Sequence, residues 1–152
     1  TENVAEDVTE DVADIAVALQ PFPADSNLVC LALNPIGNRS LQQMNAFVRR
    51  LHDELSSDPQ HPLQLKEFFS SMTTLRPDAI GADQMLRVLS QLDIDPQTLD
   101  ANCADSDRVV ILRHTLMNPY LIDHENGISY IDRYFEFLTR RVRALVAAGP
   151  QE

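Results

Sequence analysis

The segment from Val109 to Pro119, with the sequence VVILRHTLMNP, constrains most strongly how this chain can fold. Apart from one arginine and one histidine, residues 109–117 are apolar or threonine, which is typical of a strand buried on both faces. The Asn118-Pro119 pair ends the run, because proline favours turns and cannot donate to a sheet ladder. A buried guanidinium is costly without a partner. We therefore predict a buried strand in which Arg113 meets an anion, either another side chain or a ligand.

Two further segments have the character of strands. Residues 28–33 are apolar and end at a second Asn-Pro pair, Asn34-Pro35. Residues 63–75 alternate poorly between polar and apolar positions, but their phenylalanines and threonines favour a strand. We predict that the strands near 28–33 and 108–117 share one sheet, because both are too apolar at their centres to face water.

Helical spacing of apolar residues occurs in four segments, 4–19, 40–56, 82–92 and 128–146. Each has one apolar stripe to bury against other elements; in the third, the stripe consists of Met85, Leu86, Leu89 and Leu92. N-capping patterns begin two of the helices, Ser40 with Gln43 and Ser129 with Asp132. An N-cap is a better account of residues 37–40 than a phosphate site. The fold class is α+β, with a small antiparallel sheet of about three strands and helices packed on one face.

Charge and composition exclude several classes of protein. The net charge of −11 argues against a nucleic-acid partner. No apolar run reaches the length of a membrane span, and no signal peptide is apparent. The chain starts at Thr1, which is consistent with excision from a longer protein. We expect Cys30, in a predicted buried strand, and Cys103, in a polar loop, to be reduced, and the protein to be cytoplasmic.

The residue patterns predict no metal site and no catalytic residue within this chain. The four histidines, at positions 52, 61, 114 and 124, contain no pair at helical spacing. The aspartates of residues 93–100 lack the glycine and glutamate that a calcium loop requires. No nucleophile elbow is present, although the sequence alone leaves open a Ser/His/Asp or Cys/His nucleophile pair brought together by the fold. The aromatic residues of the last helical segment, together with Phe68 and Phe69, are best read as core and interface.

The two Asn-Pro-terminated strands and the closing helix resemble the C-terminal small domain of group II pyridoxal-phosphate-dependent amino-acid decarboxylases. In that family the last strand carries an arginine five residues before its stop, as Arg113 precedes Asn118 here, and an amphipathic helix closes the chain. The resemblance covers roughly residues 26–147. It implies the C-terminal domain fold of pyridoxal-phosphate-dependent transferase-like enzymes. It divides the chain into an acidic helical leader or linker, residues 1–25, and the small domain, residues 26–152.

The resemblance also implies a function. The parent enzyme would be a homodimeric carboxy-lyase that removes the α-carboxylate of an amino-acid substrate. This domain would wall the active site beside the cofactor-binding large domain, and Arg113 would bind a substrate carboxylate. The only lysine, Lys66, does not follow a histidine as the family's cofactor lysine does. We therefore expect the chain alone neither to bind pyridoxal phosphate nor to decarboxylate.

An alternative remains open. The chain can also be a non-catalytic acidic α+β domain that binds a protein partner through an exposed helix face, and Arg113 can simply pair with a nearby carboxylate. A single cofactor-less domain fits both functions. The presence or absence of an upstream segment with a cofactor lysine separates them.

Overall fold

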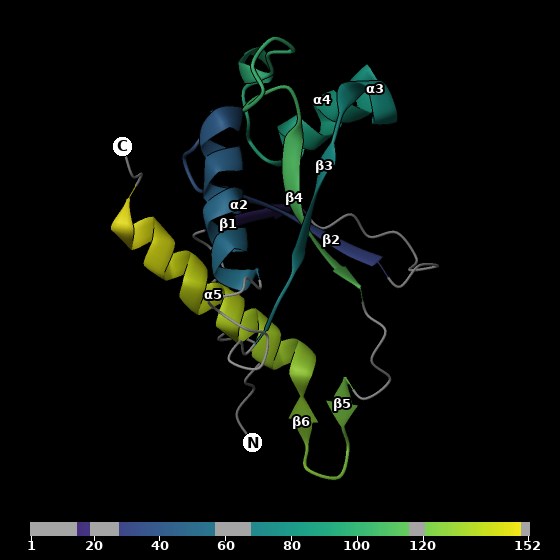
Figure 1. The fold of residues 1–152 in the computed structure, drawn as a ribbon, viewed down its shortest axis with the longest axis vertical. Helices are drawn as coiled ribbons and strands as arrows, with labels where there is room; N and C mark the ends of the chain where they lie inside the picture. The colour runs from purple at the N-terminus through teal and green to yellow at the C-terminus, as the bar shows by residue number, and fades with distance from the viewer. Residues whose placement is uncertain (1–14, 19–27, 57–67, 116–120, 150–152) are drawn as a thin grey trace.

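The computed structural model of the chain describes residues 15–18, 28–56, 68–115 and 121–149 (Figure 1). The larger elements are a four-stranded sheet, two long helices and a short helical layer. Their bounds are β1 (Ile15–Ala18), β2 (Leu28–Pro35), α2 (Leu41–Leu55), β3 (Ser71–Leu75), α3 (Pro77–Ile80), α4 (Ala82–Gln91), the 3₁₀ turn η3 (Pro96–Thr98), β4 (Val109–Thr115), β5 (Ile122–Asp123), β6 (Ile128–Ser129) and α5 (Tyr130–Ala148). None of the helices in these ranges is long and apolar enough to cross a membrane.

The main sheet is antiparallel throughout, with the strand order β1-β2-β4-β3. β2 pairs with β4 from Leu28 opposite Thr115 to Leu31 opposite Leu112. β3 pairs with the other side of β4, from Ser71 opposite Arg113 to Leu75 opposite Val109. The prediction that residues near 28–33 and 108–117 share one sheet is confirmed, as is the α+β fold class.

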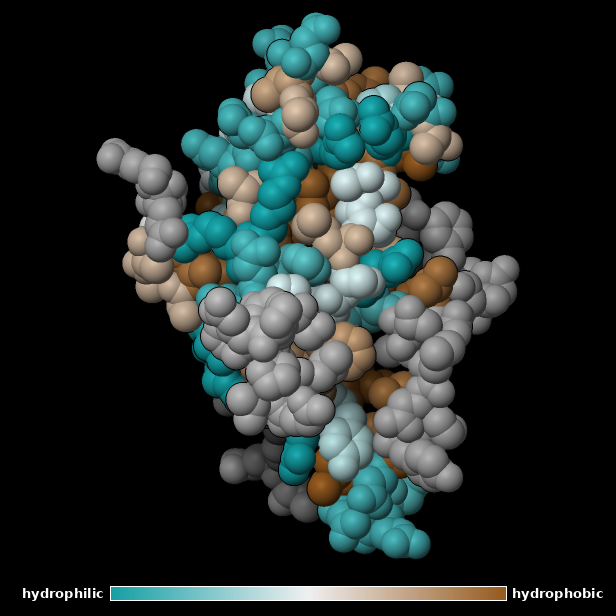
Figure 2. Space-filling model, viewed as in Figure 1, coloured by the Kyte–Doolittle hydropathy of each residue, from teal (hydrophilic) through white to brown (hydrophobic). Residues whose placement is uncertain are grey.

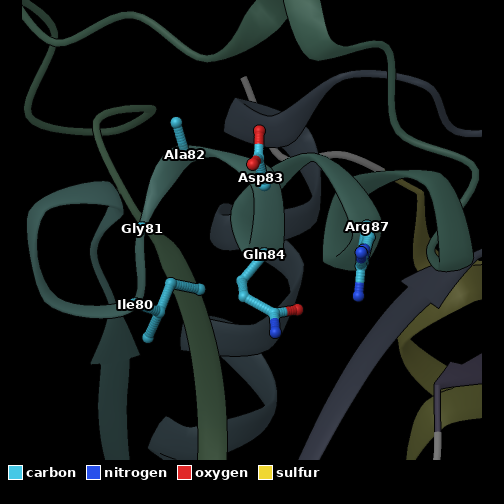
Figure 3. A pocket seen from close by; sticks show the side chains of 6 residues that line it. All are labelled: Ile80, Gly81, Ala82, Asp83, Gln84 and Arg87. Carbon is cyan, nitrogen blue, oxygen red and sulfur yellow. The ribbon is translucent and has the colours of Figure 1, made fainter.

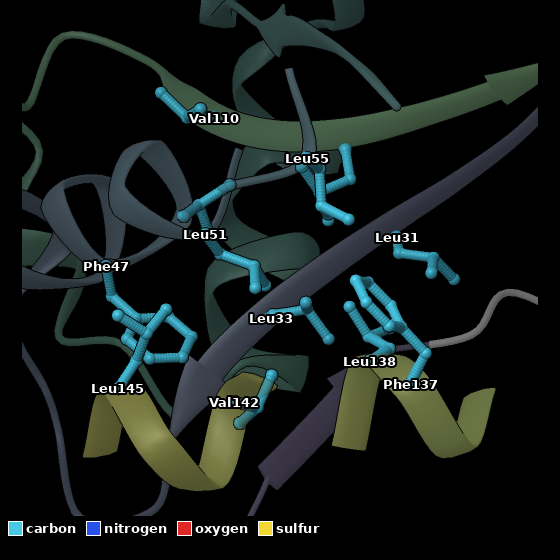
Figure 4. Packing of buried hydrophobic residues seen from close by; sticks show 12 residues of the cluster. Leu31, Leu33, Phe47, Leu51, Leu55, Val110, Phe137, Leu138, Val142 and Leu145 are labelled. Atoms are coloured by element: carbon cyan, nitrogen blue, oxygen red, sulfur yellow. The ribbon is translucent and has the colours of Figure 1, made fainter. Parts of the chain in front are cut away.

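Helices α2 and α5 pack together on one face of this sheet, as predicted (Figures 1 and 4). Strand side chains on this face alternate along β2 and β4 and meet the apolar stripes of both helices. The cluster contains the buried residues Leu31, Leu33, Phe47, Val48, Leu51, Leu55, Val110, Leu112, Phe137, Leu138, Val142 and Leu145. Figure 4 shows the side chains of α5 pointing toward the strand that carries Leu31 and Leu33.

The opposite face of the sheet has a smaller apolar cluster. It joins Ala32, Val109 and Ile111 of the strands to Met85, Leu89, Leu92 and Ile94 of α4 and the turn after it, and to Leu41 and Met44 at the start of α2. Leu86, which we predicted on the apolar stripe of this helix, is 48% exposed instead. The helix is short and touches the sheet along a narrow line, so only Met85 and Leu89 of its side chains are fully covered.

Other sequence predictions also need correction in the described residues. Residues 15–18, predicted as part of a helix over 4–19, form β1, because this uncharged and partly β-branched stretch pairs with the edge of β2. Residues 4–14 lie outside the described residues. Ile128 belongs to β6 rather than to the last helix, because Asn126-Gly127 closes a hairpin with β5 before the helix begins. Cys30 is exposed rather than buried, for a reason given below.

Candidate functional site

Arg113 lies at the point where β4 leaves the core. Its strand is held by apolar neighbours on both faces as far as Leu112, which has no exposed surface. Residues directly opposite each other in antiparallel strands point to the same face. Cys30 of β2 and Ser71 of β3 are both opposite Arg113. The three side chains therefore form one row across the sheet.

No described helix covers this row of side chains. The same face is buried at Val109 and Ile111, where α4 packs, but that cover ends there. Cys30 and Arg113 are exposed, Ser71 is half-buried, and Leu28 at the start of β2 is 49% exposed. We refer to Leu28, Cys30, Ser71 and Arg113 as the open sheet end.

The open sheet end explains two failed predictions. We predicted a buried Cys30 and a buried Arg113 in apolar strands, but apolar character along a strand does not reveal how far the covering helix extends. The anion predicted beside Arg113 is absent from the described residues, where its partner is a neutral hydroxyl. The end of the predicted strand, residues 116–119, lies outside the described residues.

A two-way contact with Ser71 fixes the base of the Arg113 side chain. The Arg113 Nε–H donates to Ser71 Oγ at 3.2 Å, and the Ser71 hydroxyl donates to the Arg113 carbonyl oxygen at 2.9 Å. Within the described part of the chain, the two Nη groups have no hydrogen-bonding partner. A guanidinium carries five donors in a planar fork, so four of them remain available to a planar anion such as a carboxylate.

The next residue, His114, points to the opposite face of the sheet and contacts α5. Its Nε2 lies 2.5 Å from the Tyr134 hydroxyl oxygen, and the two ring centroids are 4.9 Å apart. Burial lowers the pKa of His114, while a main-chain contact with Val29 acts in the opposite direction. Burial also raises the pKa of Tyr134 above its usual range. The imidazole is therefore neutral at neutral pH.

Two pockets elsewhere on the described surface are lined by fewer groups that could act in catalysis. One, of about 430 Å³, lies at the start of α4, where Figure 3 shows Asp83 pointing away from Gln84 and Arg87. The other, of about 420 Å³, is mostly apolar and lies between α2 and the end of α5; its one charged residue, Arg50, donates to the Gly149 carbonyl oxygen. Neither brings together an acid and a base or a nucleophile and a base. In the described ranges no group of three or more histidine, cysteine, aspartate or glutamate side chains is placed to bind a metal ion.

Sequence reasoning found Arg113 but missed its surroundings. Ser71 and Tyr134 carry no motif, and only the sheet register and the helix position bring them beside Arg113 and His114. The alternation of strand side chains already implied that Arg113 and His114 face opposite sides. The two N-caps are confirmed: Ser40 accepts from the Gln43 N–H and Ser129 from the Asp132 N–H.

Comparison with known protein families gives one informative result. Residues 2–142 match the family described as "Tyrosine decarboxylase, C-terminal". No match is found among curated proteins. The family match includes the whole sheet and most of α5, and therefore the open sheet end. Because it spans nearly the entire sequence, the chain belongs to the tyrosine decarboxylase C-terminal domain family.

Proposed function

We propose that this chain is the C-terminal domain of a pyridoxal-phosphate-dependent decarboxylase acting on tyrosine, in which the open sheet end forms one wall of the active site and Arg113 binds the substrate carboxylate. The observation that carries this proposal is an exposed guanidinium with unused donors on a sheet end that no described helix covers. The family match supports the reaction class.

The local geometry suits carboxylate binding. The contact of Ser71 with Nε and with the main-chain carbonyl limits the motion of the Arg113 side chain and leaves the Nη groups for a ligand. Leu28 and Cys30 flank the guanidinium on the β2 side. When another surface covers this end, water leaves and the ion pair strengthens because the local dielectric constant falls.

The cofactor belongs to another segment under this proposal. A pyridoxal enzyme binds its cofactor through a lysine. The described residues contain none, and the only lysine of the sequence, Lys66, lies outside them. The described residues therefore do not fit covalent binding of the cofactor. We assign that role to a large domain of the same enzyme, which would be a cytoplasmic homodimer.

Exposed apolar side chains indicate where the large domain docks. Phe69, Ile122, Ile131 and Phe135 are each between 37% and 62% exposed. Phe69 follows Phe68, whose ring contacts Tyr134 of α5, and the other three belong to the hairpin β5–β6 and the first turns of α5, which meet at one end of the molecule (Figure 1). Figure 2 shows hydrophobic side chains at the surface there. We call these four residues the apolar end. Such patches on a domain mark an interaction surface.

The substrate role is tested in the full-length enzyme with Arg113→Met. We expect the KM for tyrosine, and the Ki of its deaminated analogue hydroxyphenylpropionate, to rise by about 10- to 100-fold, because a carboxylate loses a charge-assisted contact. The Ki of tyramine, which has no carboxylate, should not change. Arg87→Met removes an exposed guanidinium from α4 and is the matched control. An Arg113→Met enzyme that binds hydroxyphenylpropionate normally refutes the role.

A second experiment tests the division of labour between domains. The chain alone, mixed with pyridoxal phosphate, should show no absorbance band of a protein-bound Schiff base and no release of carbon dioxide from tyrosine. The control for nonspecific amine reaction is Lys66→Ala. A band that forms in the wild-type chain and disappears in Lys66→Ala would show that this domain holds the cofactor itself.

A further inference from the structure

After Arg113, the end of β4 has main-chain support on only one side. β3 pairs with β4 no further than Ser71 opposite Arg113. Just before this pair the chain turns away, because the Ser70 N–H donates to the Leu55 carbonyl oxygen at the end of α2. Beyond Arg113, the described ladder continues only with β2. The position of the strand end must therefore be set partly by side chains.

The contact between His114 and Tyr134 supplies that support from the α5 side. The two atoms of the hydrogen bond, Tyr134 Oη and His114 Nε2, are 2.5 Å apart. The Tyr134 ring is itself held by edge contacts, with centroid distances of 5.3 Å to Phe68 and 5.6 Å to Phe135. Tyr134 also packs against the main apolar cluster. Tyr134 is thus a firmly packed residue that can hold the end of β4 in place through its contact with His114.

His114 follows Arg113 directly in the chain, so a contact that fixes the His114 side chain also fixes the position of the Arg113 main chain. The two side chains point to opposite faces of the sheet, and a shift of the His114 main chain moves the Arg113 Cα by a similar amount. A carboxylate contact with a guanidinium fork is sensitive to such displacements, because both oxygens must meet donors at once.

We infer that His114 and Tyr134 are positioning residues for Arg113, and that their hydrogen bond sets the affinity of the enzyme for the substrate carboxylate. This inference rests on the proposed function of Arg113. The pair touches no substrate and acts through the strand end. Its removal weakens carboxylate binding selectively, while ligands without a carboxylate bind as before.

The test uses the full-length enzyme and the variant Tyr134→Phe, which removes one hydroxyl and keeps the packed ring. The control Tyr130→Phe removes the same atom one helical turn earlier, where the ring is exposed. We expect Tyr134→Phe to raise the Ki of hydroxyphenylpropionate by about three- to tenfold, with the Ki of tyramine and kcat unchanged. Tyr130→Phe should change neither Ki. His114→Phe, which removes the imidazole side of the same hydrogen bond, should reproduce the selective effect.

A double variant separates this inference from the proposed function. Once Arg113→Met has removed the guanidinium, adding Tyr134→Phe should not raise the Ki of hydroxyphenylpropionate any further, since the pair acts only through that group. If Arg113→Met raises this Ki but Tyr134→Phe does not, the inference alone is refuted. The inference is also refuted if Tyr134→Phe raises both Ki values equally. It is likewise refuted if Tyr134→Phe raises the Ki of hydroxyphenylpropionate as much in the Arg113→Met background as in the wild type. If Arg113→Met has no effect, the proposed function fails and the inference with it.

Discussion

The side-chain oxygen of Asn45 accepts the main-chain N–H of Val110 at 2.9 Å, so that a buried amide of α2 is joined to the second residue of β4. The Nδ2 group of the same side chain donates to the carbonyl oxygens of Asp105 and Arg108, at 2.8 and 2.7 Å. One side chain thereby satisfies three main-chain groups where the polar loop enters the central strand. Buried polar groups left without partners are strongly unfavourable.

We predict that Asn45→Ala destabilises the chain by about 2–4 kcal/mol, because three main-chain groups lose their partner in a site that water reaches poorly. The measurement is the urea concentration at half-unfolding. Gln42→Ala, on the exposed side of the same helix, should change the free energy of unfolding by less than about 0.5 kcal/mol. Equal losses in the two variants would show that the Asn45 contacts contribute nothing specific.

A second prediction concerns the two leucines of α4. Leu89 has no exposed surface, whereas Leu86, three residues earlier, is 48% exposed. We expect Leu89→Ala to cost about 2–5 kcal/mol in the free energy of unfolding, as for other buried leucines, and Leu86→Ala to cost less than about 1 kcal/mol. Thermal unfolding of both variants measures the difference. A larger loss for Leu86→Ala would place the other side of α4 against the sheet.

The third prediction is a pH dependence of stability that comes from His114. Burial lowers its folded-state pKa below the ordinary value of 6.5. As the pH falls below about 6.5 the unfolded chain takes up the proton first, so stability falls until the pH has passed the folded-state pKa. Denaturant unfolding between about pH 7 and pH 5 should show a smaller loss in His114→Phe than in the wild type. His124→Gln, in an exposed turn, is the control and should retain the wild-type slope.

The fourth prediction concerns the apolar end. The chain without its large domain should self-associate in sedimentation experiments as its concentration rises, because this surface is then uncovered. Ile131→Ser together with Phe135→Ser should reduce that association. The control pair, Leu86→Ser and Val146→Ser, removes exposed apolar side chains elsewhere on the surface and should not. In the full-length enzyme the first pair should lower the melting temperature more than the second.

Much of this fold follows from local patterns. The apolar runs of β2 and β4, the stripes of α2 and α5 and the two serine caps each act over a few residues, so the sequence predicts them correctly. β1 was mistaken for a helix because Val12, Ile15 and Leu19 have helical spacing. Pairing with the edge of β2 decided its conformation, and such a partner is remote in sequence.

The candidate site was harder to predict than the fold. Arg113 stood out because a charge interrupts an apolar strand, but its exposure depends on where α4 ends over the sheet. The same cause exposes Cys30, in a strand whose composition predicts burial. Ser71 and Tyr134 reach the site only through the register of β3 and the position of α5. Contacts of this kind depend on the tertiary arrangement and leave no local signal.

The central position of β4 has a consequence for how the chain acquires its structure. β2 and β3 each pair with β4 and not with each other, yet β4 is synthesised after both. The ladder between β2 and β4 joins residues as far apart as Leu28 and Thr115, and closing so long a loop is entropically slow. On the ribosome, β3 therefore remains without its pairing partner until Arg113 has emerged. A chain that stops before Val109 keeps two strand edges open to other molecules, and we expect it to aggregate.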